Sequence, residues 1–112
     1  TAENTVNTEH DVTHHAELNL ISAATRQFSP EALSKMTLYT STEPCAMCAG
    51  AIYWAGVRKM VYGCPAETLG GMATGSFVVP SRELFAHGDE ETVVVGPVME
   101  ETAVSVHEGF WE

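Results

Sequence analysis

The first third of the chain places apolar residues at helical spacing behind a polar start. Residues 1–12 show no apolar period and are predicted to form a loop. From Thr13 onward apolar side chains recur every three or four positions, which predicts an amphipathic helix over residues 14–27 with Thr13 as its N-cap. A Ser-Pro pair then predicts a short helical turn over residues 29–33.

The middle of the chain alternates short apolar runs with one apolar helix. Residues 36–40 are predicted to form a buried strand, and Pro44 marks the start of a helix that ends at Gly56. Residues 59–63 are predicted to form a second strand. Because a helix of this length joins the two strands, they are expected to be parallel and connected in a right-handed sense. Core positions are expected at Tyr53, Trp54 and Met60.

The last third is less regular. Residues 64–76 are glycine-rich and are predicted to be irregular, and a helical turn is expected over residues 81–87. Residues 92–96 predict a third strand, and residues 99–108 predict a closing helix. The alternation of helix and strand indicates an α/β fold built in layers.

The composition is typical of one folded domain. At 112 residues, 45% of them hydrophobic, the chain is expected to form a single domain over residues 1–112. Five Lys and Arg against fifteen Asp and Glu give a net charge of −10, and the basic residues are scattered. Polymeric nucleic acid is therefore a poor first candidate for a partner. No apolar run approaches the ~18 residues of a membrane span and no signal-peptide pattern is present, so a cytoplasmic location without a membrane partner is expected.

Cys45 and Cys48, three positions apart, have three interpretations: a redox pair, half of a structural zinc site, or part of a catalytic one. His15 and these cysteines are expected in the first turns of two helices, where free N–H groups favour thiolates. One imidazole and two thiolates leave one position of a tetrahedral zinc ion open, which favours catalysis. Glu17 is expected beside the metal as a general acid and base. Cys64 is expected to be a buried, inert thiol.

The two motifs together resemble the signature of zinc-dependent nucleobase and nucleoside deaminases of the cytidine deaminase-like superfamily, H-x-E followed by P-C-x-x-C. The positions that match it are His15, Glu17, Pro44, Cys45 and Cys48. The stretch STEPCAMCAGAIYWAGVRKMVYG, residues 41–63, is similar to the branch that includes guanine deaminases and tRNA adenosine deaminases. The resemblance is good over residues 2–63 and loose beyond them.

The resemblance implies a three-layer α/β/α fold with a mixed sheet of five strands, one zinc ion per active site held by His15, Cys45 and Cys48, and a homodimer. It also implies that Asn4, the backbone N–H of Ala16, and Pro44 contact the substrate. The aromatic pair Phe110 and Trp111 has two interpretations: a helix end packed on the sheet, or a cover over the active site.

One feature departs from the family. Members carry a helix and two strands ahead of the segment that matches residues 2–17, and this chain lacks them. The strand at 36–40 would then be an exposed edge, which proteins avoid. A separate or omitted upstream segment is therefore expected to complete the fold.

The function indicated by these observations is hydrolytic removal of an amino group from a free nucleobase or nucleoside, with guanine or guanosine preferred. The alternatives are a tRNA adenosine deaminase, a cytosine or cytidine deaminase, and, outside enzymes, an inactive zinc-binding interaction module.

Overall fold

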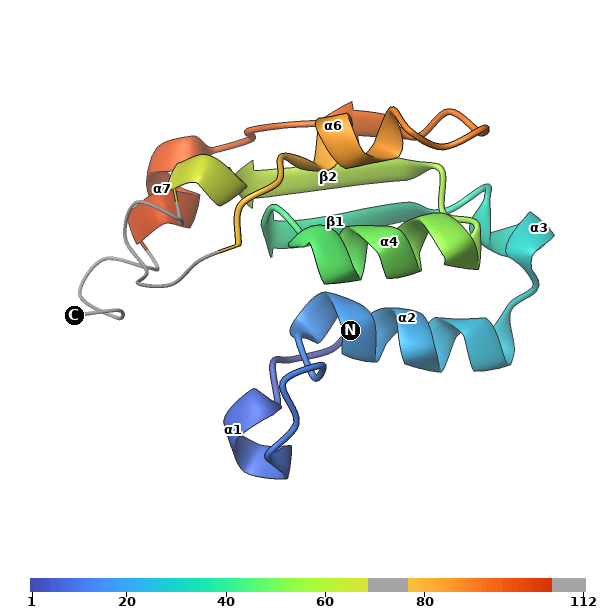
Figure 1. Ribbon diagram of the computed structural model, residues 1–112, viewed down its shortest axis with the longest axis horizontal. Helices are drawn as coiled ribbons and strands as arrows, with labels where there is room; N and C mark the ends of the chain where they lie inside the picture. The colour runs from blue at the N-terminus through green and yellow to red at the C-terminus, as the bar shows by residue number, and fades with distance from the viewer. Residues whose placement is uncertain (69–76, 106–112) are drawn as a thin grey trace.

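The computed structural model describes residues 1–68 and 77–105 (Figure 1). It contains a parallel sheet in the order β1-β2-β3. The strand bounds are Thr37–Thr42 for β1, Lys59–Cys64 for β2 and Val93–Val95 for β3. The predicted α/β fold and the parallel pairing of the first two strands are confirmed. All three described strands are parallel, so the antiparallel part of the expected mixed sheet stays a prediction.

The helices lie before, between and after these strands in the chain. Their bounds are Val6–Glu9 for α1, Ala16–Gln27 for α2, Pro30–Leu33 for α3, Ala46–Ala55 for α4, Ser81–Phe85 for α6 and Glu100–Ser105 for α7. In Figure 1, α4 runs alongside β1 with α2 on its other side, and α6 lies over β2. None of the helices in the described parts of the chain is long and apolar enough to cross a membrane.

The core lies between one face of the sheet and the helices α2, α4 and α6. Leu38, Met60 and Val94 are paired across the three strands and therefore share this face. They pack against a cluster that includes Ile21 of α2, Ile52 of α4 and Phe85 of α6. This packing fixes α2 and α4 on the same face, with their N-termini at one end.

Helix α7 lies on the opposite face of the sheet. Gly63 of β2 alternates to that face, and a Cβ atom there would lie 2.6 Å from the Cβ of Ala103 in α7. Only glycine permits this approach. The rest of the face is open, because Tyr39 of β1 is 74% exposed and Val93 and Val95 of β3 are exposed as well.

Several predicted boundaries were wrong by a few residues. The N-cap of α2 is His15 and not Thr13, because Asp11 Oδ1 accepts hydrogen bonds from both the N–H and the hydroxyl of Thr13. Helix α4 begins at Ala46, after Pro44, with Cys45 as its N-cap. Strand β1 extends to Thr42, which pairs with Cys64.

Two further expectations were wrong. The segment predicted to be a loop contains α1, whose first N–H group, from Val6, donates to Asn4 Oδ1. Trp54 is 84% exposed and is not a core residue, whereas Met60 is fully buried. Cys64 is buried as expected. Residues 69–76, the end of the predicted closing helix, Phe110 and Trp111 lie outside the described residues.

Candidate metal centre

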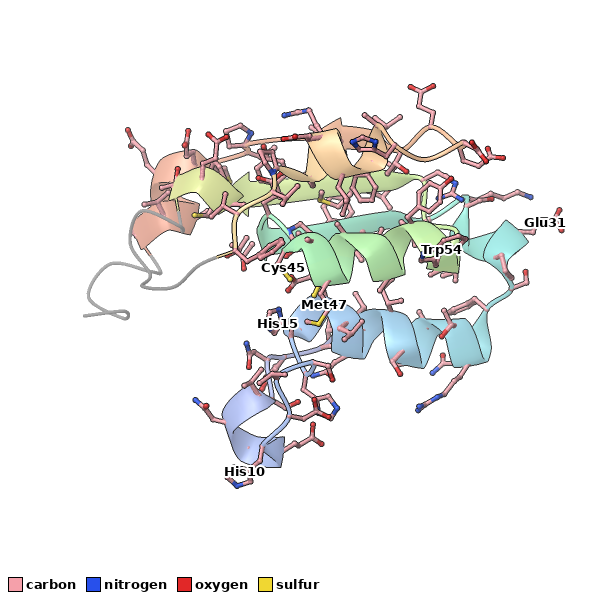
Figure 2. All side chains as sticks on the ribbon, viewed as in Figure 1. His10, His15, Glu31, Cys45, Met47 and Trp54 are labelled. Atoms are coloured by element: carbon pink, nitrogen blue, oxygen red, sulfur yellow. The ribbon has the colours of Figure 1, made fainter. Side chains whose placement is uncertain are left out.

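The N-termini of α2 and α4 bring three metal-binding side chains together. His15 is the N-cap of α2, Cys45 is the N-cap of α4, and Cys48 lies in the first turn of α4. The His15 Nδ1 atom is 3.6 Å from the sulfur of Cys45 and 3.6 Å from that of Cys48. Figure 2 shows His15 and Cys45 facing each other across the space between the two helices.

The local backbone explains why these side chains are free to meet. His15 has an extended conformation, with φ −66° and ψ 153°, and its side chain makes no hydrogen bond to its own helix. Cys45 is likewise extended, with φ −67° and ψ 172°. This extended conformation is the usual one for an N-cap residue, and it keeps the side chain beside the first turn of the helix that follows. The partial positive charge of each helix N-terminus then favours anionic sulfur at this place.

The spacing of the three ligand atoms fits zinc. All three lie within 4.8 Å of one another. Zinc bonds are about 2.0–2.1 Å to nitrogen and about 2.3 Å to sulfur. At a tetrahedral angle these bond lengths place a bound nitrogen about 3.6 Å from a bound sulfur. The distances from His15 to the two sulfurs match this value. His15, Cys45 and Cys48 would therefore hold the ion, and a fourth position would remain for a non-protein ligand.

Without a metal ion the two sulfurs share a proton. A hydrogen bond from the Cys48 thiol, together with first-turn N–H groups and the His15 ring, lowers the pKa of Cys45 to about 5 against the effect of burial. The same hydrogen bond and burial raise the pKa of Cys48. A bound zinc ion would deprotonate a coordinating thiol outright. In the metal-free pair, Cys45 is therefore the thiol that ionises first.

Glu17 lies beside this cluster but is not one of the three ligands. It is the second residue of α2, and burial raises the pKa of its carboxyl group, while the Cys48 thiol and His15 lower it. Glu17 and Ala16 also line a cleft of about 370 Å³ at the edge of the sheet. The remaining residues that line the cleft are Thr1, Ala2, Leu20, Leu38, Tyr39, Thr40 and Ser41. A carboxyl group that is easily protonated therefore faces a space open to a small molecule.

Most of the other predicted substrate contacts do not line the cleft that contains Glu17. Asn4 is exposed, and its Oδ1 atom is engaged with the N–H of Val6. Pro44 is fully buried and does not line the cleft. Phe110 and Trp111 lie outside the described residues. Of the predicted substrate contacts, only Ala16 lines the same cleft as Glu17.

Asn19, which the sequence pattern did not indicate, anchors the N-terminal segment on α2. Its Nδ2 group donates to the carbonyl oxygen of Glu3 at 2.8 Å and to Thr5 Oγ1 at 2.9 Å, on either side of Asn4. A longer contact of 3.3 Å reaches the carbonyl oxygen of His14. Asn19 is two positions from the buried Ile21 and therefore lies on nearly the opposite side of α2, so the apolar period of the helix gave no signal for it.

Comparison with known proteins agrees with this geometry. Residues 1–64 match the family model described as the cytidine and deoxycytidylate deaminase zinc-binding region. The chain is 42% identical over 107 residues to a protein of Schizosaccharomyces pombe named probable cytosine deaminase, covering 91% of this chain and 65% of that protein. It is 34% identical over 110 residues to a tRNA-specific adenosine deaminase of Bacillus subtilis, covering 98% of this chain and 66% of that protein.

Among solved structures, a guanine deaminase from Nitrosomonas europaea matches with a TM-score of 0.77 and 25% identity, covering 97% of this chain and 63% of that one. The chain thus spans less than two thirds of the length of these relatives. Since the family model covers more than half of the chain, the protein belongs to the cytidine and deoxycytidylate deaminase family and carries its zinc-binding region.

Proposed function

We propose that the protein hydrolytically deaminates a free nucleobase, with guanine as the first candidate substrate. The observation that supports this is a cluster of one imidazole and two sulfurs at zinc spacing, with a non-ligand carboxyl group beside it. Zinc, when bound, supplies a water molecule made more acidic by the metal. Glu17, beside the cluster, would accept a proton from the attacking water as a C–O bond forms and would donate it to the leaving nitrogen. The C–N bond breaks and ammonia leaves.

Two observations favour a free base over a nucleoside or RNA. Proteins named as guanine and cytosine deaminases, both of which act on free bases, are similar to this chain over more than nine tenths of its length. The net charge of −10 also opposes an RNA backbone. We rank guanine first because a guanine deaminase has a similar fold over 97% of this chain. Cytosine is the second candidate.

Substrate contacts follow from the same proposal. The Ala16 N–H group, at the start of α2, is directed toward a carbonyl oxygen or ring nitrogen of the base, and its position in the cleft with Glu17 supports this. Asn4 contributes a side-chain amide from the segment that Asn19 anchors. Phe110 and Trp111 complete the proposed contacts, and Pro44, which is fully buried, is not one of them.

The direct test is an ammonia-release screen with guanine, adenine, cytosine and their nucleosides. We expect ammonia release from guanine. In Glu17→Gln the rate of release should fall by a factor of about 10²–10⁴, while zinc stays bound. Glu31→Gln is the matched control, because Glu31 is exposed on α3 at the far end of the molecule from His15 (Figure 2). No release from any base would contradict the proposal and favour an inactive zinc-binding module. Full activity in Glu17→Gln would contradict the role proposed for Glu17.

A tRNA adenosine deaminase is the second candidate function, favoured by the similarity to the Bacillus subtilis protein. Binding of RNA by phosphate contacts weakens steeply as salt rises. Inosine formation in a tRNA anticodon stem-loop that falls sharply between low and high salt would establish it. Activity on free guanine that is insensitive to salt would support the first candidate.

We further propose self-association through the outward side of α4. This stripe consists of Met47, Gly50, Ala51 and Trp54, at positions i, i+3, i+4 and i+7, and it carries no charge. Trp54 is 84% exposed and Met47 is 39% exposed, and a Cβ on Gly50 would meet only open space. In a chain of net charge −10, an uncharged stripe lets two copies approach without opposing carboxylates. An antiparallel pair sets Met47 against Trp54 of the second copy.

Light scattering tests this interface. Trp54→Ser is expected to weaken a dimer by about 2 kcal/mol, roughly thirtyfold in dissociation constant, since buried tryptophans dominate interfaces. Val12→Ser is the control, because Val12 is 78% exposed and lies between α1 and α2, outside the stripe. An unchanged mass distribution in Trp54→Ser would exclude the stripe.

We also propose that a further polypeptide segment covers the open edge and face of the sheet. Tyr39, Val93 and Val95 are exposed on that face, and parallel sheets are ordinarily covered on both faces. Thermal unfolding of residues 1–112 alone tests this. A cooperative transition from a monomer would show that no such segment is needed.

A further inference from the structure

A carboxylate is buried directly behind the metal centre. Glu43 is only 6% exposed and lies two residues before Cys45, in the loop between β1 and α4. Glutamate is almost never fully buried unless its charge is compensated. Within residues 1–68 and 77–105, no Lys, Arg or His forms an ion pair with Glu43. Its compensation must therefore come from hydrogen-bond donors.

Among the described residues, three donors satisfy the two oxygens of Glu43. The Oε1 atom accepts from the N–H of Ala66 at 2.9 Å. The Oε2 atom accepts from the N–H of Ser81 at 2.7 Å and also from the Ser81 hydroxyl group. The Ser81 side chain is itself fully buried. The Glu43 backbone N–H donates to the carbonyl oxygen of Cys64 at 2.7 Å.

These bonds join three segments that are distant in sequence. The loop that carries Cys45 is tied to the segment just after β2, 23 positions away from Glu43, and to the first residue of α6, 38 positions away. Pro44, between Glu43 and Cys45, is fully buried and has a restricted φ angle. A displacement of the Glu43 carboxylate is therefore transmitted to the backbone of Cys45 with little freedom to absorb it.

We propose that Glu43 is a positioning residue that fixes the Cys45 sulfur at zinc-binding distance from His15 and Cys48. Glu43 does not belong to the ligand cluster, so it acts through the loop and not on the ion. The inference depends on the metal centre and not on which base is deaminated. Its failure would leave the proposed substrate untouched, and a wrong substrate would leave this inference untouched.

The chemistry of the site makes glutamine a sharp probe. In Glu43→Gln one acceptor oxygen becomes an NH2 group, which would face the N–H of Ala66 or that of Ser81, donor against donor. Supporting residues behind metal ligands typically change affinity by about 10–100-fold, and we expect zinc to bind Glu43→Gln weaker by that factor. Glu67→Gln is the matched control and should bind zinc normally, because Glu67 is exposed on the segment after β2.

The test uses the purified protein with two readouts besides activity. Zinc affinity is measured by competition with a chromophoric chelator, and the geometry of the ligands by the visible absorption of the Co²⁺-loaded protein. We expect weaker zinc binding and a changed Co²⁺ spectrum in Glu43→Gln. A lower melting temperature with unchanged affinity and spectrum would overturn the proposal and leave Glu43 as a residue of general stability.

Ser81→Ala keeps the proposal testable if Glu43→Gln does not fold. This variant removes one of the three donors to Glu43 and leaves the carboxylate in place. We expect Ser81→Ala to bind zinc about threefold to tenfold more weakly than the unmodified protein. This loss of affinity is smaller than the one expected for Glu43→Gln, because the carboxylate is kept. Wild-type zinc affinity in folded Ser81→Ala would contradict the proposal.

Discussion

Helices α2 and α4 perform the same task at their N-termini and differ almost everywhere else. Each begins immediately after a metal-binding residue, His15 for α2 and Cys45 for α4. Helix α2 buries Ile21 and exposes a polar side that includes Arg26. Helix α4 contains no charged residue in its ten positions. It packs between α2 and α6, and its outward stripe is apolar as well.

The difference shows which helix fixes the geometry of the centre. A helix that is apolar all round is normally enclosed on every side. Helix α4 carries two of the three ligands and is held by the sheet, by α2 and by α6. Helix α2 carries one ligand and packs by a single stripe, with Asn19 anchoring the segment that precedes it. We therefore expect α4 to be the rigid half of the site.

Removing a ligand is expected to have the largest effect. A structural zinc site of four ligands contributes about 12 kcal/mol, so one thiolate is worth about 3 kcal/mol, roughly 150-fold in affinity. Cys48→Ala should therefore leave the purified protein without stoichiometric zinc, as measured by elemental analysis. Cys64→Ala is the control, because Cys64 is also fully buried but lies outside the cluster. Stoichiometric zinc in Cys48→Ala would remove that residue from the ligand set.

Truncating the buried faces of the two helices compares their packing directly. Ile52 of α4 is 0% exposed and Ile21 of α2 is 5% exposed. Burial of this kind makes Ile→Ala cost about 2–5 kcal/mol of the free energy of unfolding. We expect Ile52→Ala to fall in the upper part of that range and Ile21→Ala in the lower part, measured by urea unfolding of the metal-free protein. The reverse order would mean that α2 is the better fixed helix.

A smaller effect on stability is expected from the ionisation of Glu17, in the first turn of α2. Because burial raises the pKa of Glu17 above its ordinary value of 4.5, ionising this group costs more in the folded than in the unfolded protein. Its destabilising effect is absent below the unfolded pKa and grows as pH rises through the folded pKa. In the metal-free protein, Glu17→Gln should therefore raise stability near neutral pH.

Denaturant unfolding across the pH range measures this effect. The advantage of Glu17→Gln over the unmodified protein should vanish at acidic pH, where both states of the unmodified protein are protonated at this position. Glu31→Gln, at an exposed carboxylate, should show no such trend. An advantage that instead grows as pH falls would contradict the burial of Glu17.

Much of the fold could be predicted from local pattern, because the strands and long helices follow their apolar periods. His15, Cys45 and Cys48 could be predicted together because two motifs at helix starts converge when the helices share one face of a parallel sheet. The N-cap of α2 could not be predicted, because the Thr13 hydroxyl group donates a hydrogen bond to Asp11 instead of capping the helix. The roles of Glu43 and Asn19 depend on partners 23, 38, 16 and 14 positions away, which no local period reports.

The exposure of Trp54 was also beyond the local pattern. An apolar helix gives no sign of which side faces the sheet, because every side looks equally suited to burial. Only the packing of α4 against the sheet shows that Ile52 lies inside and Trp54 outside.

X-ray absorption spectroscopy of the zinc-loaded protein tests whether His15, Cys45 and Cys48 hold the ion and leave one position to solvent. It does so directly, because it reports the type and distance of the atoms bound to the metal. We expect two sulfur ligands at about 2.3 Å, one imidazole nitrogen at about 2.0–2.1 Å and one further light atom from solvent. A shell completed by a third sulfur or a second imidazole would make the centre a closed structural site and contradict the account.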